Sequence, residues 1–159
     1  MNEQFKKKKL FIWILLTVLL TGTIDILFAF IINYHVPASI ILKFIASGLF
    51  GSVAFSDGTK MVYYGLLLHY CIVFIWTTFF FMLHAKLLNV VKLNFILVFI
   101  TGLIIWAVMN LIVVPLSQIP LQQFHAVSII ENMAALILAY GLPITLISNK
   151  FYNTASLNK

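Results

Sequence analysis

The chain has 159 residues, of which 63% are hydrophobic and 9% are charged, and its mean hydropathy is +1.10. A soluble globular domain usually carries about 25% charged residues, so this chain has too few polar side chains to cover a water-soluble surface. The composition therefore excludes a soluble globule and predicts an integral membrane protein that forms a single membrane domain over residues 1–159.

Four long apolar runs follow one another along the chain. They cover residues 10–33, 61–83, 93–114 and 127–148. Each run is long enough to span a hydrocarbon core, which needs about 20 residues of helix. None of them alternates with a period of two, as a membrane-spanning strand would. The fold class is therefore all-α, an integral membrane four-helix bundle.

The first apolar run directly follows four consecutive lysines at 6–9. This arrangement resembles the start of a signal peptide, but the apolar run is much longer than the about 7–15 residues of a signal peptide, and no small-residue cleavage site follows it. We therefore expect an uncleaved first transmembrane helix.

The lysines also predict the orientation of the chain. If the N-terminus is cytoplasmic, the cytoplasmic lysines are Lys6, Lys7, Lys8, Lys9, Lys86, Lys92, Lys150 and Lys159. Only Lys43 and Lys60 then lie outside, so the excess of positive charge places both termini in the cytoplasm. Lysines beside helix ends face anionic lipid headgroups, and the net charge of +6 therefore indicates a bilayer and not nucleic acid as the partner.

The connection between the first two runs is too apolar for a solvated loop. Pro37 suits the first position of a helix, and apolar residues recur behind it at helical spacing up to about residue 51. We expect an interfacial helix over residues 37–51. Small residues at Ser47, Gly48 and Gly51 predict close packing against another helix. This segment is either a lid on its own bundle or a re-entrant pore segment.

Polar residues inside the spans carry most of the functional information, because an ionisable group in a membrane rarely faces lipid. Asp25 and His69 lie at similar distances from the outer ends of the first two helices, at 1.5 Å per residue, so they could pair. Asn110, Glu131 and Asn132 fall in the same outer third. We therefore expect a polar intramembrane cluster of these five residues, with Thr17 and Thr21 on the same helix face as Asp25.

Three interpretations of this polar cluster remain open from the sequence. Its members can serve only as hydrogen bonds between helices. They can instead form a pocket for a proton, an ion or a small ligand, because Asp and His at mid-depth are typical of proton relays. In the third interpretation the helices are not adjacent and the residues never meet.

The remaining candidates indicate no cofactor and no metal. His35, His125 and Glu131 lack any diagnostic metal-ligand spacing. His84 is expected to cap the inner end of the second helix, and Cys71 is expected to be a buried, inert thiol. The chain has no recognisable catalytic motif, and we predict no catalytic residues. Pro143 predicts either a hinge or a kink at the end of the fourth helix.

Several short strings along the chain resemble those of one protein family. They are Gly22-Thr23-Ile24-Asp25, Ile45-Ala46-Ser47-Gly48-Leu49-Phe50-Gly51 with Ala54-Phe55, Gly65-Leu66-Leu67-Leu68-His69, Met109-Asn110 with Val114-Pro115-Leu116-Ser117, and Gly141-Leu142-Pro143-Ile144. They are similar to an uncharacterised family of small four-helix proteins of the bacterial inner membrane. The resemblance implies recurring polar positions at Asp25, His69 and Asn110 but no activity. Asp57 departs from the small residue usual in that pattern.

Three classes of function are compatible with this sequence. The first is a non-catalytic membrane component, either a subunit of a larger complex or a homo-oligomer. The second is a carrier or pore for a proton, an ion or a small solute, built around Asp25 and His69. The third is an intramembrane enzyme that uses the same two residues as general acid and base.

Overall fold

The computed structural model describes residues 3–56, 58–90, 94–119 and 126–157. These residues form helices and short connections, and no strand occurs among them. Four helical segments are long and apolar enough to cross a membrane. They are Lys7–Ile32, Lys60–His84, Asn94–Leu116 and Ala126–Tyr152. The predicted all-α fold with four spanning helices is confirmed.

The helices extend beyond most of the predicted boundaries. The first two long helices are α1 (Glu3–Ile32) and α4 (Lys60–Val90). The third segment consists of α5 (Asn94–Val108), the π-helical turn η1 (Met109–Val113) and α6 (Val114–Leu116). The fourth consists of α7 (Ala126–Leu136), the π-helical turn η2 (Ile137–Gly141) and α8 (Leu142–Leu157). The apolar runs thus located the spans, while the polar residues beside them continue the same helices.

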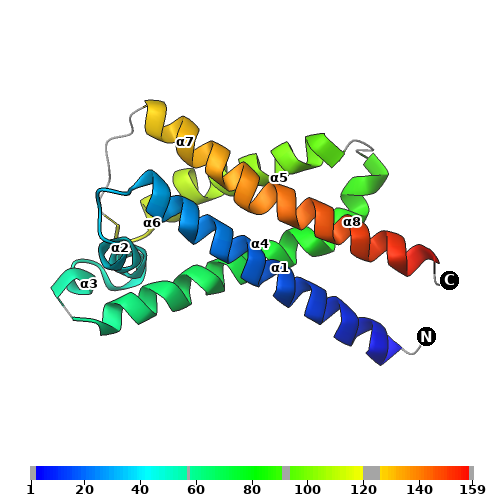
Figure 1. Cartoon of the computed structure of the whole chain (residues 1–159), viewed down its shortest axis with the longest axis horizontal. Coiled ribbons are helices and arrows are strands. Elements are labelled where there is room, and N and C mark those ends of the chain that lie inside the picture. Colours follow the sequence, from blue (N-terminus) through cyan, green and yellow to red (C-terminus); the bar gives the residue numbers. More distant parts are fainter. Residues whose placement is uncertain (1–2, 57, 91–93, 120–125, 158–159) are drawn as a thin grey trace.

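The two chain ends lie at the same end of the molecule, as four crossings require (Figure 1). The short elements α2 (Ala38–Phe50), α3 (Val53–Ser56) and α6 lie together at the opposite end. We call the end that carries α2 and α3 the distal end and the end that carries the termini the terminal end.

Helix α2 crosses the distal end of the bundle. In Figure 1 it is seen nearly end-on, whereas the long helices run across the view. It packs mainly on α4, where Gly65 allows close approach, because a Cβ at this position would overlap the carbonyl group of Leu42. The predicted extra helix between the first two spans is therefore present, and it packs as a lid on its own bundle.

The small residues of α2 contact a different partner from the one expected. Gly48 and Gly51 face the segment that follows α6, not a neighbouring helix. The backbone N–H of Gln118 donates to the Gly48 carbonyl at 3.3 Å, and its side-chain amide donates to the Leu49 carbonyl at 3.0 Å. Gly51 has a φ of 60°, a conformation that glycine adopts without strain. These contacts tie the lid to the end of the third segment.

The fourth segment is the centre of the bundle. It packs against α1, α4 and α5, whereas α4 and α5 contact each other little although they are consecutive in the chain. The buried apolar core lies between these helices. It contains Ile14, Val18, Val73, Phe80, Phe81, Ile105, Leu136, Ala139, Tyr140, Ile144 and Phe151.

Each π-helical turn lies just before a proline. The turn η1 precedes Pro115 and the turn η2 precedes Pro143. Proline has no N–H, and its ring collides with the carbonyl group four residues earlier, so a wider turn relieves the conflict. The helix continues past Pro143 to Leu157. The expectation that Pro143 marks a kink at the end of the fourth helix was therefore wrong.

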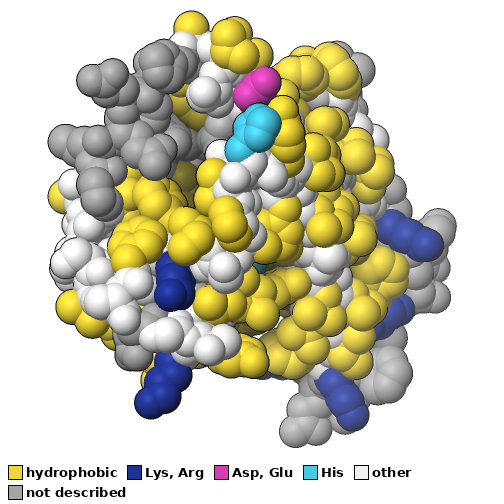
Figure 2. Space-filling view, turned by 60° about the vertical axis from the view of Figure 1, so that its left-hand side comes forward, with side chains coloured by type: hydrophobic (Ala, Val, Ile, Leu, Met, Phe, Trp, Pro, Cys, Tyr) yellow, Lys and Arg dark blue, Asp and Glu magenta, His cyan; other side chains and the backbone are white. Residues whose placement is uncertain are grey.

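The outer surface of the bundle is apolar. Figure 2 shows hydrophobic side chains over most of one face, interrupted by scattered lysines. Large side chains such as Leu16, Ile75 and Leu111 are more than half exposed. Cys71 is also exposed, so the prediction of a buried thiol was wrong. A surface of this kind is stable where lipid covers it.

Candidate functional site

The predicted partners Asp25 and His69 meet inside the bundle. Asp25 Oδ2 lies 3.9 Å from His69 Nδ1, and the His69 side chain is buried. The other ring nitrogen, Nε2, lies 2.8 Å from the Gly22 carbonyl oxygen. A carbonyl can only accept, so Nε2 carries a proton and Nδ1 faces the carboxylate. A hydrogen bond between these two groups then requires a second proton, on either the imidazole or the carboxyl group.

A third helix completes this site. The buried hydroxyl group of Tyr140, in η2, donates to Asp25 Oδ2 at 3.2 Å. Sequence reasoning did not select Tyr140, because a tyrosine in an apolar run looks like an ordinary core residue. The three side chains come from α1, α4 and η2, and we refer to them as the Asp25 cluster. The arrangement brings three titratable groups together, with a hydrogen bond between Tyr140 and Asp25 and a separation of 3.9 Å between Asp25 and His69.

The threonine stripe on α1 points into the bundle as expected. Thr17 and Thr21 are both fully buried. The hydroxyl group of Thr17 donates to the Trp13 carbonyl at 2.7 Å. This orientation places Asp25, on the same helical face, toward α4 and η2 and away from lipid.

The other predicted cluster members lie elsewhere. The Asn110 side-chain amide donates to the Trp106 backbone carbonyl at 3.0 Å and to the side-chain oxygen Oδ1 of Asn132 at 3.3 Å. This pair joins η1 to α7. The sequence therefore identified residues that do form contacts between helices, but it merged two separate pairs into one cluster. Equal depth along the helices does not determine which helices face each other.

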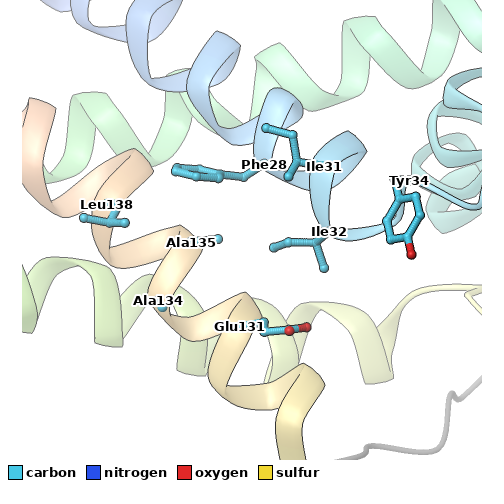
Figure 3. Close-up of a pocket in the computed structure, with 8 residues that line it drawn as sticks. All are labelled: Phe28, Ile31, Ile32, Tyr34, Glu131, Ala134, Ala135 and Leu138. Carbon is cyan, nitrogen blue, oxygen red and sulfur yellow. The ribbon is translucent and has the colours of Figure 1, made fainter.

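Glu131 is exposed and belongs to neither pair. It lines an open pocket of about 480 Å³ between the distal end of α1 and the start of the fourth segment (Figure 3). The lining residues are Phe28, Ile31, Ile32, Tyr34, Glu131, Ala134, Ala135 and Leu138. In Figure 3 the Glu131 carboxylate extends from α7 below Ile32 and Tyr34.

A second polar cluster lies toward the terminal end. His84 Nε2 lies 2.7 Å from Asn149 Oδ1, and the Asn149 amide donates to Asn94 Oδ1 at 2.8 Å. His84 is buried, and α4 continues to Val90. His84 is therefore not a helix cap, as the sequence suggested, but a link between α4, α8 and α5.

The sequence contains a signal for this second cluster that depth alone does not provide. Thr145, Ser148, Asn149 and Tyr152 recur at intervals of three and four residues, which is a polar stripe on one helical face. Thr145, Ser148 and Asn149 are buried, and the Tyr152 hydroxyl group donates to the Phe81 carbonyl at 3.0 Å. The stripe was not recognised because the fourth span was predicted to end at residue 148, before Asn149 and Tyr152.

The described residues contain no group of three or more His, Cys, Asp or Glu side chains that could hold a metal ion. The aromatic rings of His35 and Tyr34 are in contact, with centroids 3.6 Å apart. His125, the remaining sequence candidate for a metal ligand, and Asp57 lie outside the described residues.

Comparisons with known proteins give no relative. No protein-family model matches the chain, and no curated protein and no solved structure matches it.

Proposed function

We propose that the chain is a non-catalytic component of a bacterial cytoplasmic membrane, either as a subunit of a larger complex or as a small homo-oligomer. Both termini are cytoplasmic in this proposal, since that orientation puts most lysines on the cytoplasmic side. The resemblance of strings such as Gly65-Leu66-Leu67-Leu68-His69 to bacterial inner-membrane proteins supports the choice of membrane.

One observation carries this proposal: polar side chains inside the spans bond to groups of neighbouring helices. His69 bonds to the backbone of α1, Tyr140 bonds to Asp25, and Asn149 links α4 to α5. Such bonds hold helices together in a membrane, where no water competes for the polar groups. A bundle stabilised in this way needs no substrate to explain its buried polar residues.

Isolation of the tagged protein in mild detergent tests the proposal directly. Mass spectrometry of the purified material should find partner proteins in fixed stoichiometry, or a defined oligomer of this chain alone. A monomer without partners would contradict the proposal.

The Asp25 cluster favours a second function, a small carrier or pore for a proton, an ion or a small solute. The Asp25 side chain retains 21% exposure and lies beyond hydrogen-bond distance from His69 Nδ1. A carboxyl group that is partly exposed and not fully hydrogen-bonded can change its protonation state during a transport cycle.

An acidification assay in vesicles separates the two functions. The purified protein is reconstituted into vesicles that contain a pH-sensitive dye. A carrier should dissipate an imposed proton gradient, and Asp25→Asn should abolish this dissipation. Glu131→Gln removes an exposed carboxylate outside the cluster and should keep the dissipation. A gradient that persists with wild-type protein would exclude proton transport.

A further inference from the structure

The pocket beside Glu131 has the chemistry of a lipid site. Its walls are apolar, and its two polar groups are the Glu131 carboxylate and the Tyr34 hydroxyl group. Phe28 and Ile32 extend from α1 toward the fourth segment, and Leu138 lines the opposite side (Figure 3). A volume of about 480 Å³ lies within the range of pockets that bind small ligands, about 300–1,000 Å³.

The pocket lies between the distal end of the first candidate span and the distal part of the fourth. The first candidate span ends at Ile32, two residues before Tyr34, and Glu131 lies on α7, in the distal part of the fourth candidate span. Tyr34 therefore lies just beyond the end of the first span, and Glu131 lies inside the fourth.

Charge decides which headgroup fits. Glu131 is the one exposed acidic residue among the side chains that the structure describes, in a chain with a net charge of +6. A carboxylate at this depth is costly unless a cation or a donor meets it, and no ion pair to Glu131 occurs among the described residues. A primary ammonium group supplies both charge and hydrogen-bond donors.

We propose that this pocket binds one phospholipid with a primary amine headgroup, such as phosphatidylethanolamine. One acyl chain lies between α1 and the fourth segment, and the ammonium group meets the Glu131 carboxylate. The site uses residues outside the Asp25 cluster, so it can exist whichever function proposed above holds.

Native mass spectrometry of the purified protein tests the proposal with three added lipids. Phosphatidylethanolamine has a primary amine, phosphatidylcholine has a quaternary amine without donors, and phosphatidylglycerol has no cation. We expect one phosphatidylethanolamine molecule to be retained about tenfold better than either of the others, as the loss of one charge-assisted hydrogen bond implies.

Two pairs of variants sharpen this test. Glu131→Gln should retain all three lipids equally, whereas Tyr63→Phe, at an exposed position outside the pocket, should keep the preference. Leu138→Trp should fill the pocket and abolish retention, while Leu146→Trp, at a similarly exposed leucine of the fourth segment, should not. Equal retention of the three lipids by the wild type, an unchanged preference in Glu131→Gln, or a second copy of the chain in place of the lipid would overturn the proposal.

Discussion

The carboxylate of Asp25 and the imidazole of His69 lie 3.9 Å apart, on two long helices that are separated in the chain by the whole α2–α3 lid. Their meeting depends on Gly22, because its carbonyl accepts from His69 and a Cβ at this position would come within 2.7 Å of the Tyr70 ring. The close packing of α1 on α4 brings the two titratable groups into one site.

A coupling between these residues should be measurable as stability in detergent. We expect the double variant Asp25→Ala/His69→Ala to lose less than the sum of the two single losses, by about 0.6 kcal/mol and at most about 1.7 kcal/mol. Thermal unfolding of the four proteins gives this coupling. As a control, Asp25→Ala combined with His84→Ala should be additive within about 0.5 kcal/mol, because His84 lies in the other cluster. Strict additivity for Asp25 and His69 would show that the two groups do not interact.

The hydroxyl group of Tyr140 should contribute to stability through its bond to Asp25. Tyr140→Phe removes only this hydroxyl group from a buried position and should cost about 1 kcal/mol. Tyr63→Phe makes the same change on an exposed ring and should have no measurable effect. Equal unfolding temperatures for the two variants would contradict the proposed bond.

Asn149 is expected to be the most sensitive residue of the second polar cluster, which contains His84, Asn149 and Asn94. Its Oδ1 lies 2.7 Å from His84 Nε2 on α4, and its amide donates to Asn94 Oδ1 on α5. Asn149→Ala therefore leaves both His84 and Asn94 without this partner. The loss should be about 1–3 kcal/mol, the usual cost of a buried group left unsatisfied. Leu146→Ala, at an exposed position of the same helix, is the control. A smaller loss for Asn149→Ala than for Leu146→Ala would count against this cluster.

Docking of the lid should depend on the absence of a side chain at Gly65. Gly65→Ala places a methyl group where the Leu42 carbonyl lies, and we expect a loss of about 1–3 kcal/mol together with faster proteolysis between α1 and α4. At Gly58 a Cβ meets no atom within 4 Å, so Gly58→Ala should leave both measurements unchanged. Proteolysis of Gly65→Ala at the wild-type rate would argue against close packing here.

The predicted orientation can be checked by labelling single cysteines in whole cells with a membrane-impermeant maleimide. Cys71 is exposed on α4 and must first be replaced by serine. In that background Ser56→Cys, in α3 at the distal end, should be labelled, and Asn89→Cys, near the opposite end of α4, should not. The reverse pattern would place both termini outside.

The sequence alone determined the architecture of this protein, because membrane insertion depends on local properties. A helix must satisfy its own backbone in lipid, so an apolar run of sufficient length predicts a span without knowledge of its neighbours. The same reasoning located the helix after Pro37 and the inward face of Thr17, Thr21 and Asp25. It also found the pairing of Asp25 with His69, because depth can be counted along two helices of known direction.

Only the tertiary structure decided which helices touch. The fourth segment packs on α5, whereas α4, which precedes α5 in the chain, barely contacts it. This arrangement separates the Asn110–Asn132 pair from the Asp25 cluster. The role of Tyr140 could be assigned only when helix rotation was known, because Tyr140 lies in the π-helical turn η2, which changes the direction in which side chains project. Helix rotation and adjacency arise from side-chain packing between distant segments, which composition and periodicity do not encode.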